Sequence, residues 1–458
     1  MGASRALAGC LLLTASVCSV AQDASPPSGQ ASSQSSSQSS SQPQVHRSVR
    51  HIQVEDEDSP SQPAELTQAE SAIDKRDYAA AEPLLRKLVE REPASYVGWF
   101  DLGFVENALG KLDESIAAYR KSVEAKPDVF ESNLNLGLQL AKTAQPDAEQ
   151  FLRAATQLKP TNHVAEGQYR AWLSLAETIG KSKPEEALAA YQQAAALQPE
   201  EAEPHLAAGL LLEGENNYAQ AEQEYKQALT LDSRSTEAVM ALANIYMRGR
   251  RFPEAEEYLR KLLAANADSA AVHLQLARVL AAEGNTKAAI PQMEAGVKLA
   301  PGDESALREL GNLYSSDEKN DLAEAIRRKL LAAHPNEAEL HRELGQDLLR
   351  QKKFLEAQQE FAVAVKIKPD FGIAYGDLAF AAGENKDYAL VTRALDARVK
   401  LLPETAITYF MRASAYDHLR DFKSAAVNYH LFLKTANGQY PDQEWQAKHR
   451  LIAIEPKK

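Results

Sequence analysis

The sequence predicts an all-α fold, a solenoid of antiparallel helix pairs, on three observations. A 34-residue period runs through most of the chain. Within each period, apolar residues recur at helical spacing in two segments of about a dozen residues, and a proline ends many of the periods. One helix pair cannot bury its apolar face alone, so neighbouring pairs must stack and share a core. We therefore expect about eleven pairs in a right-handed superhelical solenoid, closed by a C-terminal capping helix.

Composition and charge narrow the function classes. The chain has 458 residues, of which 44% are hydrophobic and 25% charged, and its net charge is −13. These proportions are ordinary for a globular protein. An acidic balance disfavours a nucleic-acid binder, which needs a basic face, so we expect no nucleic-acid partner. The only two cysteines, Cys10 and Cys18, leave the rest of the chain without a thiol nucleophile or a disulfide framework.

Residues 1–21 have the pattern of a secretory signal peptide. Arg5 supplies the positive start, residues 7–20 form a short apolar core, and Ser19-Val20-Ala21 places small residues before a cut at Gln22. The apolar run is shorter than the roughly 20 residues that a membrane span needs. We expect an exported protein, periplasmic or secreted, from a bacterium. A cut there also removes both cysteines.

A second interpretation of the N-terminus stays open. Leu7-Ala8-Gly9-Cys10 is similar to a bacterial lipobox, which would make Cys10 a lipidated N-terminus and tether the protein to a membrane. Only four residues separate Arg5 from Cys10, so most of the apolar core would lie on the mature side of that cut. The signal-peptide interpretation is therefore favoured.

Residues 22–61 predict a disordered linker. The segment is rich in serine, glutamine and proline, with residues 31–44 almost purely serine and glutamine. Such a composition offers too little apolar surface to offset the entropy of ordering it. The acidic run at residues 55–58 is best interpreted as a solvated part of this linker.

The repeats fill residues 62–439. Seven copies of 34 residues follow one another from Ala202 to Gln439 without insertion or deletion. Upstream, residues 96–129 form a good copy, residues 62–95 a weaker first one, and residues 130–162 a copy one residue short. A fourth copy ends at Glu201 and is preceded by extra residues near His163. The columns that set this register are Gly209, Ala243, Ala277, Gly311, Gly345, Ala379 and Ala413; Ala221, Ala255, Ala289, Ala323 and Ala357; and Pro301, Pro335, Pro369 and Pro403.

These columns resemble the tetratricopeptide repeat family. Counted from the first residue of each repeat, the family pattern places leucine at position 7, a small residue at 8, tyrosine at 11, alanine at 20, an aromatic residue at 24, alanine at 27 and proline at 32. The repeat at Ala338 matches it with Leu344, Gly345, Ala357, Phe361, Ala364 and Pro369, and has Leu348 at position 11. A Gly, Asn or Lys near position 15, as in Glu283-Gly284-Asn285, marks the turn between the helices. The resemblance implies a concave face lined by first helices, on which relatives bind peptides.

The last stretch, residues 440–458, should form a polar capping helix. We expect Trp445 and Leu451 to cover the final repeat, while Gln446, Lys448 and His449 face water.

The histidines do not predict a metal site. His205, His273 and His341 are spaced by 68 residues, which is two repeats, and each occupies packing position 4. Two stacked hairpins separate neighbouring members by roughly 20 Å, whereas metal ligands lie about 2 Å from the ion. His418 and His430 could approach one another, but no third ligand lies beside them. We expect no metal, cofactor or catalytic residue, and hence no enzyme.

The resemblance implies a partner-binding groove at positions 5, 9, 12 and 13 of the first helices. Arg308 and Asn312 match the start of the carboxylate clamp of some relatives, but Glu343, Ile373 and Asp377 depart from it. An arginine row could hold an acidic or carboxylate-bearing segment, or could simply solubilise the inner wall; both interpretations stay open. The groove candidates are Phe100, Phe104, Arg278, Arg308, Asn312, Arg342, Gln346 and Arg350.

The sequence therefore predicts an exported, non-enzymatic scaffold that binds a protein or peptide through its concave groove. The alternative is an envelope-anchored lipoprotein that assists the assembly or maturation of outer-membrane or surface structures.

Overall fold

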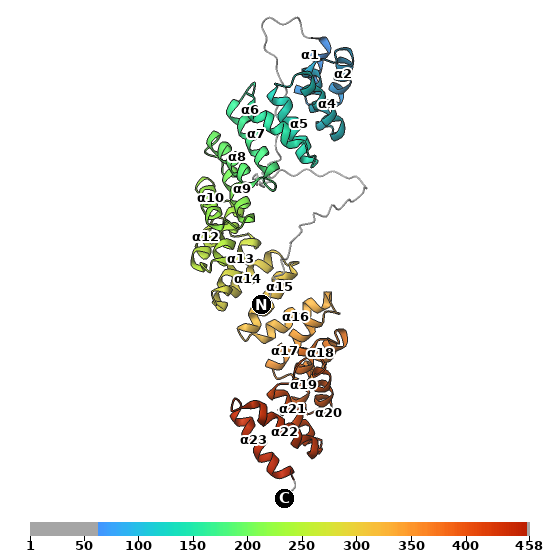
Figure 1. The fold of residues 1–458 in the computed structure, drawn as a ribbon, viewed down its shortest axis with the longest axis vertical. Coiled ribbons are helices and arrows are strands. Elements are labelled where there is room, and N and C mark those ends of the chain that lie inside the picture. The colour runs from blue at the N-terminus through green and yellow to red at the C-terminus, as the bar shows by residue number, and fades with distance from the viewer. Residues whose placement is uncertain (1–62, 456–458) are drawn as a thin grey trace, which may run out of the picture. The chain divides into compact units, whose positions relative to one another are not determined.

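A computed structural model describes residues 63–455, and in this part of the chain all regular structure is helical (Figure 1). The 23 helices found there confirm the predicted all-α class, and no strand occurs among them. The expected signal peptide, the alternative lipidation site at Cys10 and the expected linker lie outside the described residues.

The first twenty-two helices form eleven consecutive hairpins, as predicted. The N-terminal ones are α1 Ala64–Asp74 and α2 Tyr78–Arg91, α3 Tyr96–Ala108 and α4 Leu112–Ala125, α5 Phe130–Lys142 and α6 Ala148–Gln157, α7 Val164–Ile179 and α8 Pro184–Leu197. The seven regular ones are α9 Glu203–Gly214 and α10 Tyr218–Leu231, α11 Thr236–Arg248 and α12 Phe252–Ala265, α13 Ala270–Ala282 and α14 Thr286–Leu299, α15 Glu304–Ser316 and α16 Asn320–Ala333, α17 Ala338–Arg350 and α18 Phe354–Ile367, α19 Gly372–Glu384 and α20 Tyr388–Arg398, α21 Ala406–His418 and α22 Phe422–Ala436. A single helix, α23 Pro441–Ile454, follows them.

Successive hairpins share one continuous set of cores. Each helix packs against the next along the chain, and several first helices also contact the first helix of the following hairpin. The alanines at position 20 of the repeats are completely buried at Ala221, Ala255, Ala289, Ala323 and Ala357. Because alanine lets two backbones approach closely, this column fixes how tightly each hairpin closes.

The turn inside the hairpin has the same backbone conformation almost everywhere. Position 15 is left-handed, with positive φ, in ten of the eleven hairpins among the described residues. Only Gly110 and Gly284 are glycines there; the others include Arg250 (φ 56°) and Lys352 (φ 60°). The next amide donates to the carbonyl five residues back, as Lys353 does to Leu348 at 2.9 Å. This bond is the hallmark of a Schellman helix end, which requires the left-handed residue whatever its side chain.

Position 8 and position 24 of a repeat are matched in size. Where position 8 is glycine, a large side chain lies on it: a Cβ on Gly209 would lie 2.5 Å from Cε1 of Tyr225, and one on Gly345 would lie 2.6 Å from Cε1 of Phe361. Where position 8 is alanine, position 24 is smaller, as in Ala243 with Leu259. Among the seven regular repeats the pair Ala413–Tyr429 is the exception, and in the third hairpin Gly137 is paired with Leu152.

The fourth hairpin differs from the others. Its first helix, α7, has 16 residues, so the extra residues near His163 lengthen the start of that helix. His163 itself is left-handed, with φ 50° and ψ 51°, and forms the N-cap. The turn after α7 passes through Gly180 in the right-handed helical conformation, so the common position-15 geometry is missing here.

The capping helix corrects one prediction. Leu451 is buried as expected, and Gln446, Lys448 and His449 are exposed, but Trp445 is 61% exposed rather than covering the last repeat. Helix α23 instead buries Ala447 and Leu451 against the final hairpin. Trp445 lies on the outer side, with its ring 3.9 Å from that of His449. None of the helices in the described part is long and apolar enough to cross a membrane.

Candidate partner-binding site

Polar side chains link the first helices of neighbouring repeats in the middle of the array. Gln275 on α13 donates to Asn244 on α11 at 2.7 Å. Arg278 on α13 pairs with Glu309 on α15 through Nε and Nη2, both at 2.9 Å. These links recur at the same place in successive repeats, because positions 9 and 12 of one first helix face positions 6 and 10 of the next.

Arg308 and Asn312, both on α15, are occupied by partners within the chain. The two terminal nitrogens of Arg308 donate to the two carboxylate oxygens of Glu337 at 2.6 and 2.7 Å. Asn312 accepts a hydrogen bond from Arg327 at 2.5 Å. Such a two-bond pairing is the strongest that guanidinium and carboxylate form. Arg308 and Asn312, which match the start of a carboxylate clamp, thus already have hydrogen-bond partners within the chain.

Arg342 on α17 reaches the next repeat in the same way. Its Nε donates to Asp377 on α19 at 2.6 Å, and its guanidinium lies 5.8 Å from the centre of the Phe371 ring. Gln346 lies at the edge of this contact, 3.5 Å from the same carboxylate. Burial raises the pKa of Asp377, and Arg342 opposes that rise by favouring the charged carboxylate.

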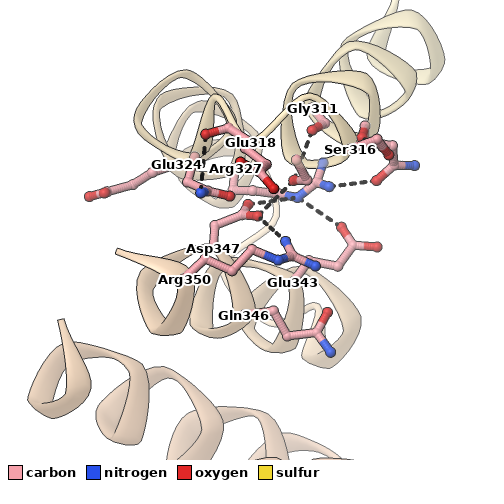
Figure 2. Close-up of polar contacts among 12 residues, drawn as sticks. Gly311, Ser316, Glu318, Glu324, Arg327, Glu343, Gln346, Asp347 and Arg350 are labelled. Carbon is pink, nitrogen blue, oxygen red and sulfur yellow. Dashed lines mark hydrogen bonds and ion pairs between the residues drawn. The ribbon is translucent and has the colours of Figure 1, made fainter. Parts of the chain in front are cut away.

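A buried ionic cluster lies beneath these residues, at the joint between α15–α16 and α17. Arg327 on α16 and Asp347 on α17 are 2% and 1% exposed. Figure 2 shows Arg327 directed from its own hairpin toward Glu343 and Asp347, with Arg350 approaching Asp347 from the other side. Nε of Arg327 lies 3.1 Å from Glu343 and 3.9 Å from Asp347.

Asp347 has two further partners in this cluster. Ser315 donates to it at 2.6 Å, and Arg350 at 3.0 Å. Burial raises the pKa of Asp347, while Ser315 and the two arginines lower it. The cluster therefore holds Arg350 against Asp347 and adds ionic contacts to the apolar packing of Leu307, Leu330 and Leu340 at the same joint.

Sequence reasoning missed Arg327, although a signal was available. It occupies position 24, where the other regular repeats have Tyr, Leu, Met or Phe, and it packs on Gly311 at position 8. A single charged residue in an otherwise apolar column is either a solvated side chain or a buried ion pair. Here it is the latter.

The aromatic candidates at the N-terminal end need a correction. Phe100 is 0% exposed and packs against Tyr119, with ring centres 5.6 Å apart. Position 5 of that repeat therefore belongs to the core, and Phe100 is not available to a partner. Phe104 is half-buried against Tyr78, at 6.0 Å between ring centres, and keeps part of its surface exposed.

The histidines lie apart, each with its own partner. His205, His273 and His341 each contact position 23 of their own hairpin. His418 stacks on Tyr388 at 4.1 Å, and His430 pairs with Glu455 at 2.7 Å. Within residues 63–455, no group of three or more His, Cys, Asp or Glu side chains is arranged to hold a metal ion.

Comparison with known families agrees with this architecture. Three family models, each described as a tetratricopeptide repeat, match the chain: one at residues 212–279, one at residues 66–130, 179–236 and 308–370, and one at residues 270–313. The chain is a tetratricopeptide repeat protein. As a TPR protein it is built as a protein-interaction scaffold, since stacked repeats offer an extended surface.

Two curated proteins are similar to parts of the TPR array. Human protein O-mannosyl-transferase TMTC1 is 27% identical over 198 residues, which cover 42% of this chain and 22% of that protein. Cellulose synthase operon protein C of Xanthomonas axonopodis pv. citri is 29% identical over 204 residues, which cover 42% of this chain and 14% of that protein. The chain spans about a fifth or less of the length of either relative.

Solved structures of TPR proteins are similar as well. YrrB, described as a TPR protein with an unusual peptide-binding site, matches with a TM-score of 0.37 and 24% identity, over 40% of this chain and 95% of that one. The C-terminal part of a TPR protein from Cytophaga hutchinsonii matches with a TM-score of 0.44 and 18% identity, over 52% of this chain and 98% of that one.

Proposed function

We propose that this TPR array is an exported, non-catalytic scaffold that holds a carboxylate-bearing segment of another protein against the first helices α13, α15 and α17. The observation that carries the proposal is the row of arginines on consecutive first helices. Arg278, Arg308, Arg342 and Arg350 keep 35, 33, 24 and 49% of their side chains exposed although each is paired. Asn312 lies on α15 with Arg308, and Gln346 lies on α17 between Arg342 and Arg350.

The internal carboxylates orient the arginines of this row and also compete with a ligand for them. Glu309, Glu337 and Asp377 each take one edge of a guanidinium, and the planar group holds its remaining N–H donors in a fixed direction. An incoming carboxylate can either add to a free edge or displace the internal one. In both cases its affinity depends on how firmly the internal partner holds the arginine.

The experiment compares two variants that break the same internal pair. Partner proteins are captured by crosslinking in the native host, and binding of the captured partner is measured for Arg308→Ala and Glu337→Gln. If Arg308 holds a ligand carboxylate, Arg308→Ala weakens binding and reduces its salt dependence, whereas Glu337→Gln frees the arginine and strengthens binding. If the pair only sets the angle between repeats, both variants act in the same direction and the proposed site is wrong.

Export rests on the sequence pattern of residues 1–21 and has its own test. Mass spectrometry of the mature protein should find Gln22 at the N-terminus. A lipidated Cys10 would instead favour the second candidate, an envelope-anchored factor for assembling surface structures. The similarity to a protein named for a cellulose synthase operon supports that candidate. Metal analysis of the purified protein, in which we expect no metal, tests the alternative of a metalloenzyme.

A further inference from the structure

Three histidines at one repeat position differ in a single hydrogen bond. His205, His273 and His341 each occupy position 4, and Nδ1 of each lies 2.6–2.8 Å from position 23 of the same hairpin. Nε2 of His273 bonds the carbonyl of Ala267, and Nε2 of His341 that of Pro335, both at 3.0 Å. Among the described residues, Nε2 of His205 has no such partner.

The loop before His205 takes a different course. Helix α9 begins at Glu203, one repeat position later than α13 and α17. Its N-cap, Ala202, has helical φ −78° and ψ −21°, whereas the N-caps Ser269 and Glu337 are extended, with ψ 104°. Pro204 stands in the first turn of α9. Because the loop enters the helix in another direction, the carbonyl six residues upstream makes no hydrogen bond to Nε2 of His205.

The same place holds a pocket of about 200 Å³ between α8, α9 and α10. Its walls are mostly apolar and come from two neighbouring hairpins, and its polar groups are the His205–Glu224 pair and Gln192. The lining residues are Leu188, Tyr191, Gln192, Ala195, Pro204, His205, Ala208 and Glu224. An apolar pocket with a few placed polar groups is the usual form of a binding site.

The polar pair defines the ligand's chemistry. The Glu224 carboxylate lies 2.7 Å from Nδ1 of His205 and can only accept, so Nδ1 carries the hydrogen. When the ring is neutral, Nε2 is then an acceptor, and a complementary ligand must bring a donor on an apolar body. The phenol of tyrosine combines these two properties.

We propose that this pocket binds a tyrosine side chain of a protein partner, with the ring against Leu188, Tyr191 and Pro204 and the hydroxyl donating to Nε2 of His205. The pocket lies on α8–α10, away from the arginine row on α13–α17. It is a second contact point on the scaffold, and its test does not depend on the arginine row.

The test follows the histidines directly by NMR of the full chain with ¹³C-labelled histidine. The probe is N-acetyl-tyrosinamide, and N-acetyl-phenylalaninamide lacks only the hydroxyl. We expect the tyrosine amide to shift the Cε1–H signal of His205 with an affinity of about 1–10 mM, and the phenylalanine amide to bind roughly three- to tenfold more weakly. His205→Leu identifies the signal and should abolish the preference for tyrosine.

His341→Leu is the matched control, because it removes a histidine from the same repeat position and from the same type of carboxylate pair. It should leave tyrosine binding unchanged, and circular dichroism checks that both variants fold. The proposal is overturned if the His205 signal does not move at about 50 mM probe, if both amides bind equally, or if the two leucine variants lose binding alike.

Discussion

Gly345 lies directly beneath the ring of Phe361, so close that a Cβ on residue 345 would lie 2.6 Å from Cε1. The contact joins the two helices of one hairpin, α17 and α18. Glycine is disfavoured inside a helix by about 1 kcal/mol relative to alanine. Its presence is therefore explained by the size of the side chain at position 24.

Gly345→Ala should destabilise the protein despite the gain in helix propensity, because overpacking costs about 1–3 kcal/mol. The double variant Gly345→Ala/Phe361→Leu recreates the Ala243–Leu259 pair and should lose less stability than the sum of the single variants. Urea unfolding followed by circular dichroism measures this coupling. Gly383→Ala is the control: its nearest neighbour is 3.8 Å away, so alanine should stabilise. Strictly additive effects at 345 and 361 would contradict the packing argument.

The buried pair Arg327–Asp347 should show the behaviour of a charge pair enclosed in a core. Arg327→Met leaves Asp347 buried with less compensation and should cost about 3 kcal/mol. Arg327→Met/Asp347→Leu replaces both charges with apolar groups and should recover most of that loss, as read from urea midpoints. Arg328→Met, at the exposed neighbouring position, should change stability by less than about 1 kcal/mol. A double variant as unstable as the single one would refute this account.

Lys352 offers a test of the hairpin turn. It is left-handed and exposed. Lys352→Gly should raise the unfolding free energy by about 0.5–1 kcal/mol, because it removes the cost of a Cβ in this conformation. Gly284→Ala, at the same position of another repeat, should lower it by a similar amount. If both variants change the unfolding free energy in the same direction, the conformation of this turn does not govern stability.

Glu324 should make the folding stability of the protein depend on pH in the acidic range. Burial raises its pKa, but hydrogen bonds from Lys353, Arg328 and Gln351 outweigh this and lower it from 4.5 to about 2. The folded protein therefore holds this proton less tightly than the unfolded chain. The stabilisation is complete above about pH 4.5 and is lost as the pH falls toward 2. Glu324→Gln should flatten thermal-melting midpoints across this interval, and an unchanged pH profile would count against the assignment.

Nearly all of the fold could be predicted from the 34-residue period of the sequence. Small residues at positions 8 and 20 and the turn at position 15 predict hairpins of fixed size, and α9 to α22 follow that register with only α9 starting one position late. Helix α23 shows the limit of this reasoning. It follows no repeat, so nothing in its sequence fixes its rotation, and Trp445 was assigned to the wrong side.

The candidate site was predicted only in part. The repeat register places Arg278, Arg308 and Arg342 on consecutive first helices, but it does not say which carboxylate each one reaches. Those partners lie 29–35 residues away and depend on side-chain length and on the angle between hairpins. Phe100 was misplaced for a related reason: position 5 faces the groove in some repeats, but here the ring turns into the core.

The exposure of Trp445 decides what an optical unfolding experiment on this protein can see. The chain has three tryptophans, and the other two, Trp99 and Trp172, are partly buried in the second and fourth hairpins. Trp445 is already in water, so melting changes its emission little. Tryptophan fluorescence will thus report the unfolding of the N-terminal hairpins but not that of the C-terminal ones. Unfolding of the C-terminal hairpins has to be followed by circular dichroism or with an added dye.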